Sequence, residues 1–111
     1  MLTIEKLRGY GADVEDGLAR CMDMEDFYIS LVAKVLEDNK LPLLEQQIGD
    51  GELDKAFETA HALKGMYANL SLTPLTRPVS EMTELLRSGT DADYSALLAE
   101  AKMQFDKLCE L

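Results

Sequence analysis

The chain has 111 residues, 47% of them hydrophobic, and its 21 acidic and 11 basic side chains give a net charge of −10. One domain over residues 1–111 is expected, with enough apolar side chains for a single core. The charge disfavours nucleic acid and anionic membrane surfaces as partners, and no apolar run is long enough to cross a bilayer.

The first part of the chain predicts two short helical pieces. Thr3 is a candidate N-cap for a helix over residues 4–8, which a pair of glycines follows. Asp13 is a candidate N-cap for a second piece over residues 14–21, where Gly17 is a weak point inside the helix.

A longer helix is predicted over residues 24–39, beginning at Asp23. Its apolar positions form a wide stripe made of Phe27, Ile29, Leu31, Val32, Val35 and Leu36. Pro42 then either starts a further turn or two or kinks the same helix. The sequence Gly-Asp-Gly at 49–51 is the clearest turn in the chain.

Residues 52–70 predict the next helix, with a core stripe made of Leu53, Phe57, Ala60, Leu63, Tyr67 and Leu70. Thr73 followed by Pro74 is typical of an N-cap and a first helical residue, and this helix is expected to end near Arg87. Pro78 predicts an irregular or kinked first turn, because its ring nitrogen has no proton to donate.

The last helix is expected after Thr90 and Asp93, which resemble a capping box. It carries a stripe made of Tyr94, Leu98, Ala101, Phe105 and Leu108. No stretch shows the alternation of a β-strand. The prediction is therefore an all-α, antiparallel four-helix bundle, with the short N-terminal helical pieces capping one end.

The compartment is expected to be the cytoplasm, because the first residues lack the basic-then-apolar pattern of a signal peptide. Cys21 and Cys109 lie far apart, in apolar helical contexts without the spacing of metal ligands. Reduced, partly buried thiols are the expectation.

The only histidine, His61, lies on the helix over 52–70. At ~100° per residue, its side chain points ~120° away from the centre of the core stripe and therefore toward solvent. Lys64 places a cation beside it, and Gly65 and Ala68 are small neighbours one and two turns further on. Glycine inside a helix costs about 1 kcal/mol relative to alanine, so its position suggests that the imidazole needs open space.

These features suit phosphoryl transfer to a histidine nitrogen. An exposed imidazole is largely neutral at pH 7 and can act as a nucleophile. A neighbouring ammonium group stabilises an anion that arrives on the ring.

The sequence HALKG from His61 to Gly65, with Asn69 and Leu70 behind it, resembles the signature of the histidine-containing phosphotransfer (HPt) domain. That family typically shows His-x-Leu-Lys-Gly and then Asn-Leu-Gly. The segment 11–32 also resembles the start of bacterial HPt domains.

The chain departs from the family pattern at a few positions. Met66 and Tyr67 stand where the family often has small residues, Ser71 stands where it often has glycine, and Pro78 interrupts the following helix. Tyr67 lies on the core stripe and Met66 is turned away from the histidine, so these departures affect packing more than chemistry.

The resemblance implies a shuttle in a multistep phosphorelay. His61 would accept a phosphoryl group from a receiver-domain aspartate and pass it to a second receiver, with Lys64 as an electrostatic helper, Gly65 giving access to the imidazole and Ala68 on the partner surface. The family uses no metal or cofactor of its own, and Mg²⁺ comes from the receiver. The implied partners are response-regulator receiver domains and, as a further candidate, a hybrid sensor histidine kinase, with this chain a monomer.

The chain is not expected to be an enzyme in the ordinary sense. It has no Gly-rich phosphate-binding loop and no room for an ATP-binding domain, so no autokinase activity is expected.

Two other interpretations compete with this one. Glu58 and His61 have the Glu-x-x-His spacing of helical di-iron bundles, but such sites need two of these units and the chain has no second histidine. A metal site is therefore not expected. The other alternative is a helical adaptor that binds a receiver or kinase without being phosphorylated, which a phosphorylation test separates from a phosphorelay intermediate.

Overall fold

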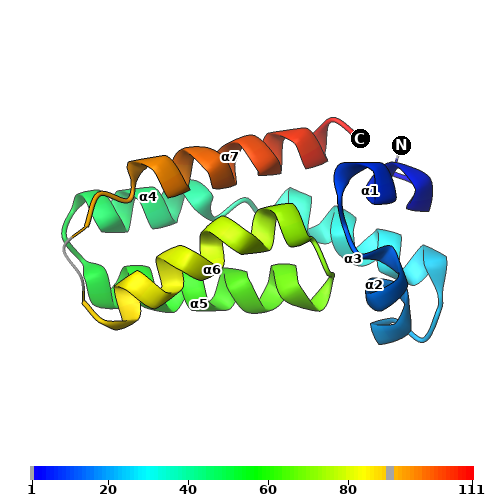
Figure 1. Cartoon of the computed structure of the whole chain (residues 1–111), viewed down its shortest axis with the longest axis horizontal. Coiled ribbons are helices and arrows are strands. Elements are labelled where there is room, and N and C mark those ends of the chain that lie inside the picture. Colours follow the sequence, from blue (N-terminus) through cyan, green and yellow to red (C-terminus); the bar gives the residue numbers. More distant parts are fainter. Residues whose placement is uncertain (1, 90–91) are drawn as a thin grey trace.

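The computed structural model describes residues 2–89 and 92–111, and in them the chain forms seven α-helices and no strand (Figure 1). The bundle consists of α4 (Leu41–Gly49), α5 (Leu53–Asn69), α6 (Thr73–Arg87) and α7 (Ser95–Cys109). Successive helices run antiparallel, α5 packs against α4 and α6, and α7 packs against α6 and α4. The predicted all-α bundle is confirmed.

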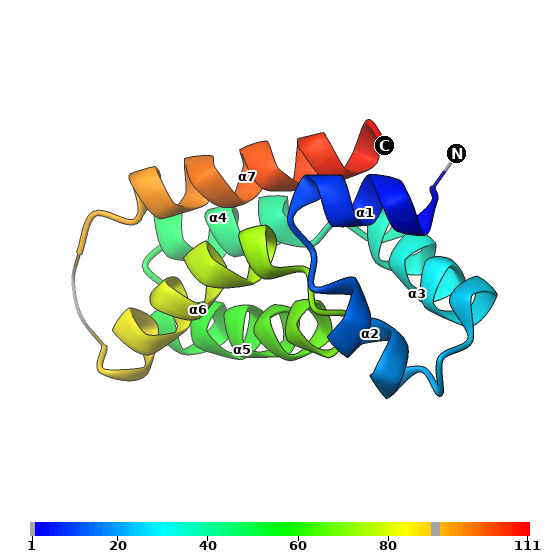
Figure 2. The same cartoon turned by 45° about the vertical axis from the view of Figure 1, so that its right-hand side comes forward.

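One end of the bundle is covered by α1 (Ile4–Tyr10), α2 (Val14–Arg20) and α3 (Glu25–Glu37). Figure 2 shows α1 beside the C-terminal end of α7, with α3 reaching beyond the bundle. The longer helix α3 was expected to be one of the four bundle helices. Instead it packs against α2 and α7, and α4 takes the fourth place. Pro42 is the second residue of α4, so it starts a new helix rather than kinking α3.

The two predicted N-terminal caps are confirmed. The side chain of Thr3 accepts a hydrogen bond from the Lys6 amide at 3.1 Å, and that of Asp13 accepts one from the Asp16 amide at 3.2 Å. Each bond satisfies a helical N–H group that has no partner within its own helix. These starts follow from local chemistry alone.

Two other predicted N-caps each differ by one residue from the observed cap, which is Met24 for α3 and Leu72 for α6. Asp23 lies in the left-handed region at φ 56°, because the chain turns tightly there and its amide donates to the Leu18 carbonyl at 2.7 Å. Thr73 is the first residue of α6 and Leu72 holds the cap position. The predicted capping residue Thr90 lies outside the described residues.

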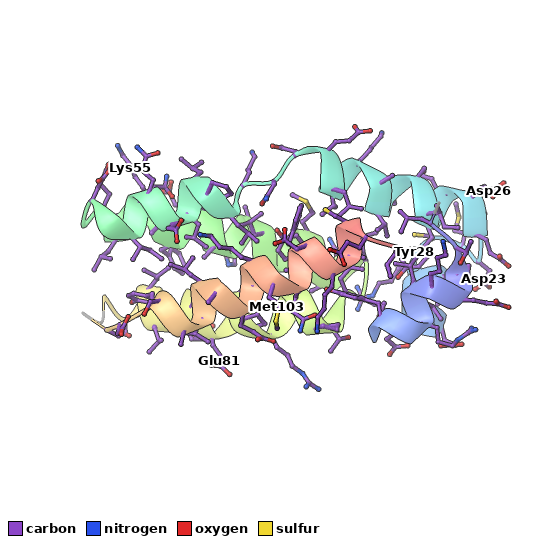
Figure 3. The ribbon with its side chains drawn as sticks, turned by 90° about the horizontal axis from the view of Figure 1, so that it is seen from above. Asp23, Asp26, Tyr28, Lys55, Glu81 and Met103 are labelled. Carbon is purple, nitrogen blue, oxygen red and sulfur yellow. The ribbon has the colours of Figure 1, made fainter. Side chains whose placement is uncertain are left out.

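The aromatic side chain that α3 buries is Tyr28 and not Phe27. Phe27 is 44% exposed although its stripe was expected to face the core, whereas Tyr28 is fully buried. A Cβ atom added to Gly17 would lie 2.7 Å from the Tyr28 ring, so the glycine makes room for that ring. The Tyr28 hydroxyl donates to the Leu70 carbonyl at 2.7 Å. In Figure 3, Tyr28 points inward at this end of the molecule, while Asp26 points outward.

The stripes of the bundle helices face the core largely as predicted. All five predicted positions of the last helix are buried. In α5, Leu53 and Phe57 are only partly buried, whereas the buried side chains of the predicted stripe are Ala60, Leu63, Tyr67 and Leu70. Pro78 is buried inside α6, which continues from Thr73 to Arg87, so the proline does not end the helix.

Neither cysteine forms a disulfide; Cys21 is buried and Cys109 is exposed, so the expectation that both are partly buried is wrong. No described helix has both the length and the apolar character that a bilayer crossing requires.

Candidate functional site

His61 lies near the middle of α5, on the face opposite the bundle core. Its side chain is exposed, whereas Ala60 and Leu63 on either side of it in the sequence are buried. This agrees with the orientation predicted from the helical period. The imidazole is therefore open to another molecule.

The imidazole ring of His61 stacks on the ring of Phe57, one turn earlier in α5. The ring centroids are 5.7 Å apart and the planes are inclined by 17°. Residues four apart in a helix are neighbours on its surface, so this contact is local to α5. Among the described residues, no hydrogen bond or ion pair involves His61, and both ring nitrogens are free while the stacking restrains the orientation of the ring.

Three charged side chains lie on the same side of the bundle as this ring pair. Lys64 Nζ is 3.7 Å from Oε1 of Glu84, and Arg87 Nε is 3.4 Å from Oε2 of the same carboxylate. The Arg87 guanidinium also lies over the Phe57 ring, 5.2 Å from its centroid. Since Glu84 and Arg87 belong to α6, the packing of α6 on α5 brings a second cation toward the histidine helix.

Sequence reasoning missed the roles of Phe57, Glu84 and Arg87. Phe57 was expected in the core, although its four-residue separation from His61 is a signal that could have identified the ring contact. Glu84 and Arg87 carry no such signal, because their position beside Lys64 depends on how α6 packs against α5.

Gly65 occupies an open position one turn after His61. A Cβ atom added there would meet no heavy atom within 4 Å. The fold therefore does not need glycine at this position for close packing, which agrees with the prediction that this face of α5 is open.

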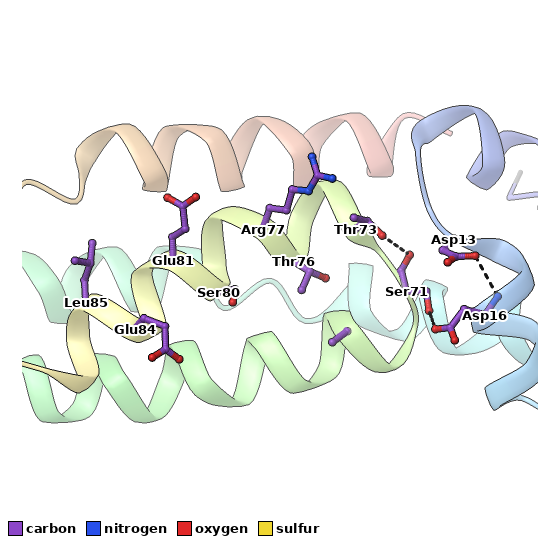
Figure 4. Close-up of a pocket in the computed structure, with 11 residues that line it drawn as sticks. Asp13, Asp16, Ser71, Thr73, Thr76, Arg77, Ser80, Glu81, Glu84 and Leu85 are labelled. Atoms are coloured by element: carbon purple, nitrogen blue, oxygen red, sulfur yellow. Dashed lines mark hydrogen bonds between the residues drawn. The ribbon is translucent and has the colours of Figure 1, made fainter.

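Ala68 is exposed two turns after His61 and borders a groove between α2, α5 and α6. The groove has a volume of about 710 Å³, and Figure 4 shows the side chains along it. The lining includes Asp13, Asp16, Ala68, Ser71, Arg77 and Glu84. The open surface beside His61 thus continues into a groove with charges of both signs.

Ser71 forms the end of this groove and explains one departure from the HPt pattern. Its φ of 55° lies in the left-handed region, where glycine has no steric penalty. The Ser71 hydroxyl donates to Asp16 at 2.5 Å, and its carbonyl accepts from the Asp13 amide at 3.0 Å. The hydrogen bonds from Ser71 and then from Arg20 lower the pKa of Asp16 below its usual value. Serine here links α2 to the connection between α5 and α6.

Among the described residues, no group of three or more His, Cys, Asp or Glu side chains is arranged to hold a metal ion. The chemistry available at the surface of α5 is that of one exposed imidazole with two cations and a carboxylate nearby.

The chain was also compared with known proteins. A family model described as the Hpt domain matches residues 24–111. The match begins just before α3, so α1 and α2 precede it. No curated protein and no solved structure matches the chain.

Proposed function

The chain belongs to the Hpt domain family, and on that premise we propose that it carries a phosphoryl group on His61 from one receiver domain to another. Members of this family are histidine phosphotransfer components of phosphorelays and interact with receiver domains. The observation that supports the assignment to His61 is the accessibility of its imidazole ring. It belongs to the only histidine of the chain and is exposed, and neither nitrogen forms a hydrogen bond or ion pair with a described residue.

The proposed step exchanges one bond to phosphorus for another. The lone pair of the unprotonated ring nitrogen forms the N–P bond while the P–O bond to the receiver aspartate breaks. The aspartate leaves as a carboxylate, and the other ring nitrogen keeps its proton, so the phosphorylated ring carries a positive charge. The reverse sequence, with a second receiver aspartate as the attacking group, unloads His61.

Lys64 is proposed as the electrostatic helper of this step, because an ammonium group near the ring stabilises the phosphoryl oxygens. Gly65 and Ala68 are proposed to let the receiver approach, since neither extends far from the helix. The Mg²⁺ that neutralises charge during transfer is proposed to come from the receiver, as is usual where catalysis consists mainly of positioning and charge neutralisation.

We also propose that the chain is a cytoplasmic monomer without autokinase activity. Its proposed binding partners are receiver domains and a hybrid sensor histidine kinase. The alternative is a helical adaptor that binds a receiver and leaves His61 unmodified. The free nitrogens and the nearby cations favour transfer, because an adaptor needs neither.

The test is transfer from a ³²P-labelled receiver domain in the presence of Mg²⁺. The expected label on the chain is acid-labile and alkali-stable, as an N–P bond is, and ATP alone should give none. His61→Gln should melt like the natural chain and accept no label, because it keeps the helix but removes the nucleophile. Transfer at the full rate in this variant would refute the assignment. Receiver binding without transfer in the natural chain would favour the adaptor.

A further inference from the structure

Glu84 places a negative charge beside the surface of α5 around His61, which is proposed to receive the negatively charged phosphoryl group. Its carboxylate lies between Lys64 and Arg87, at 3.7 and 3.4 Å. Both cations are therefore engaged by an anion of the chain itself. The arriving phosphoryl group needs cations and is repelled by carboxylates.

We propose that Glu84 is a positioning residue that holds Lys64 and Arg87 while His61 is unmodified and competes for them with the phosphoryl group on His61. This inference rests on the proposed function. Its consequence is that phosphorylated His61 is less stable than two free cations would make it. The chain would then readily pass the group on.

The geometry favours contacts of Glu84 with Lys64 and Arg87 that can be broken when a phosphoryl group arrives. Both distances exceed the 2.7–3.2 Å usual for an N–H···O hydrogen bond. The side chains of Glu84 and Arg87 are 59% and 52% exposed and that of Lys64 is 33% exposed, so solvent reaches all three charged groups. Loose, solvated ion pairs can be rearranged at small cost. Lys64 is also three residues from His61 on the same helix, within reach of a group on that ring.

Glu81 provides a matched control for the replacement of Glu84 (Figure 4). Glu84 points toward α5, whereas Glu81, one turn earlier on α6, points to the opposite side. Glu81 is exposed and forms no ion pair with any described residue. Glu84→Gln and Glu81→Gln therefore remove the same charge from the same helix, but only the first removes it from beside the two cations.

The first measurement is the equilibrium between phosphorylated receiver and phosphorylated His61. It is made below the concentration at which the two proteins form a stable complex, so that docking strength does not enter the ratio. Glu84→Gln should raise the phosphohistidine share about two- to fivefold, the size expected for one exposed charge pair. Glu81→Gln should leave the ratio near that of the natural chain, and the gain should shrink in 0.5 M salt because exposed charges are screened, with a Debye length of about 3 Å at 1 M.

The second set of variants tests whether Glu84 acts through the cations. In a chain that carries Lys64→Ala and Arg87→Ala together, adding Glu84→Gln should change the ratio much less. An unchanged or lower phosphohistidine share for Glu84→Gln alone would overturn the proposal. So would a full gain in the double-alanine background, since Glu84 would then not act by holding these two side chains.

A third measurement separates this inference from the proposed function. The chain is phosphorylated on His61 with phosphoramidate, a small donor that requires no receiver, and the phosphoryl group is titrated by ³¹P NMR. Glu84→Gln should lower its titration midpoint relative to Glu81→Gln, because an anion has been removed and two cations freed. An equal midpoint would refute the role of Glu84. Failure of every receiver to label the natural chain would refute the transfer function and leave this test intact.

Discussion

Gly65 is the residue whose replacement best separates the needs of the fold from those of phosphotransfer. Its position in the interior of α5 costs helix stability, and a Cβ atom there would meet no heavy atom within 4 Å. Gly65→Ala should therefore raise the free energy of unfolding by about 0.5–1 kcal/mol, the difference in helix propensity without an opposing steric cost. For a domain of this size the melting temperature should rise by about 2–5 °C.

The functional effect should depend on the size of the side chain. Helical side chains point back toward the N-terminus of their helix, so a leucine at position 65 would lean over the turn that carries His61. Gly65→Leu should fold at least as stably as the natural chain, because leucine is a good helix former and the space is open. Its transfer rate should fall on the order of 10-fold or more, since the receiver could no longer bring its aspartate to the ring. The transfer rate of Gly65→Ala should fall much less, because its side chain is a single methyl group.

The assay combines thermal unfolding by circular dichroism with single-turnover transfer from a labelled receiver for Gly65 and its alanine and leucine variants. Gly9 provides the control, because it is exposed in α1 and an added Cβ atom there also meets nothing within 4 Å. Gly9→Leu should leave the transfer rate unchanged. A natural transfer rate in Gly65→Leu would show that Gly65 has no role in access. A lower melting temperature in Gly65→Ala would show that the face of α5 around it is not open.

Two further predictions concern the end of the bundle. Gly17→Ala should lower the free energy of unfolding by about 1–3 kcal/mol, because its Cβ atom would lie 2.7 Å from the Tyr28 ring; chemical denaturation measures this, and a stability equal to the natural chain's would contradict the packing. Ser71→Ala should destabilise the chain above about pH 4, because the serine hydroxyl lowers the pKa of Asp16 from its usual 3.8. A depressed carboxyl pKa contributes stability above its unfolded value and loses it as the pH falls through the folded value, so the difference from the natural chain should disappear in strong acid. In an Asp16→Asn background the difference should not vary with pH, and a variation that persisted there would point to another group.

The sequence by itself determined the helical class, the approximate helix boundaries and the face of α5 that carries His61. Each depends on local information. Thr3 and Asp13 cap their helices through amides three residues away, and the helical period alone places His61 opposite the buried Ala60 and Leu63.

The tertiary structure decided which neighbour covers each face. Phe27 and Tyr28 are adjacent, and both suit an apolar stripe, but Tyr28 is buried because Gly17 of another helix leaves room for its ring. Likewise, Glu84 and Arg87 join Lys64 only because α6 packs along α5. The helical period relates residues to the axis of their own helix, whereas contacts between helices depend on how the axes are placed, and that placement is a property of the whole core.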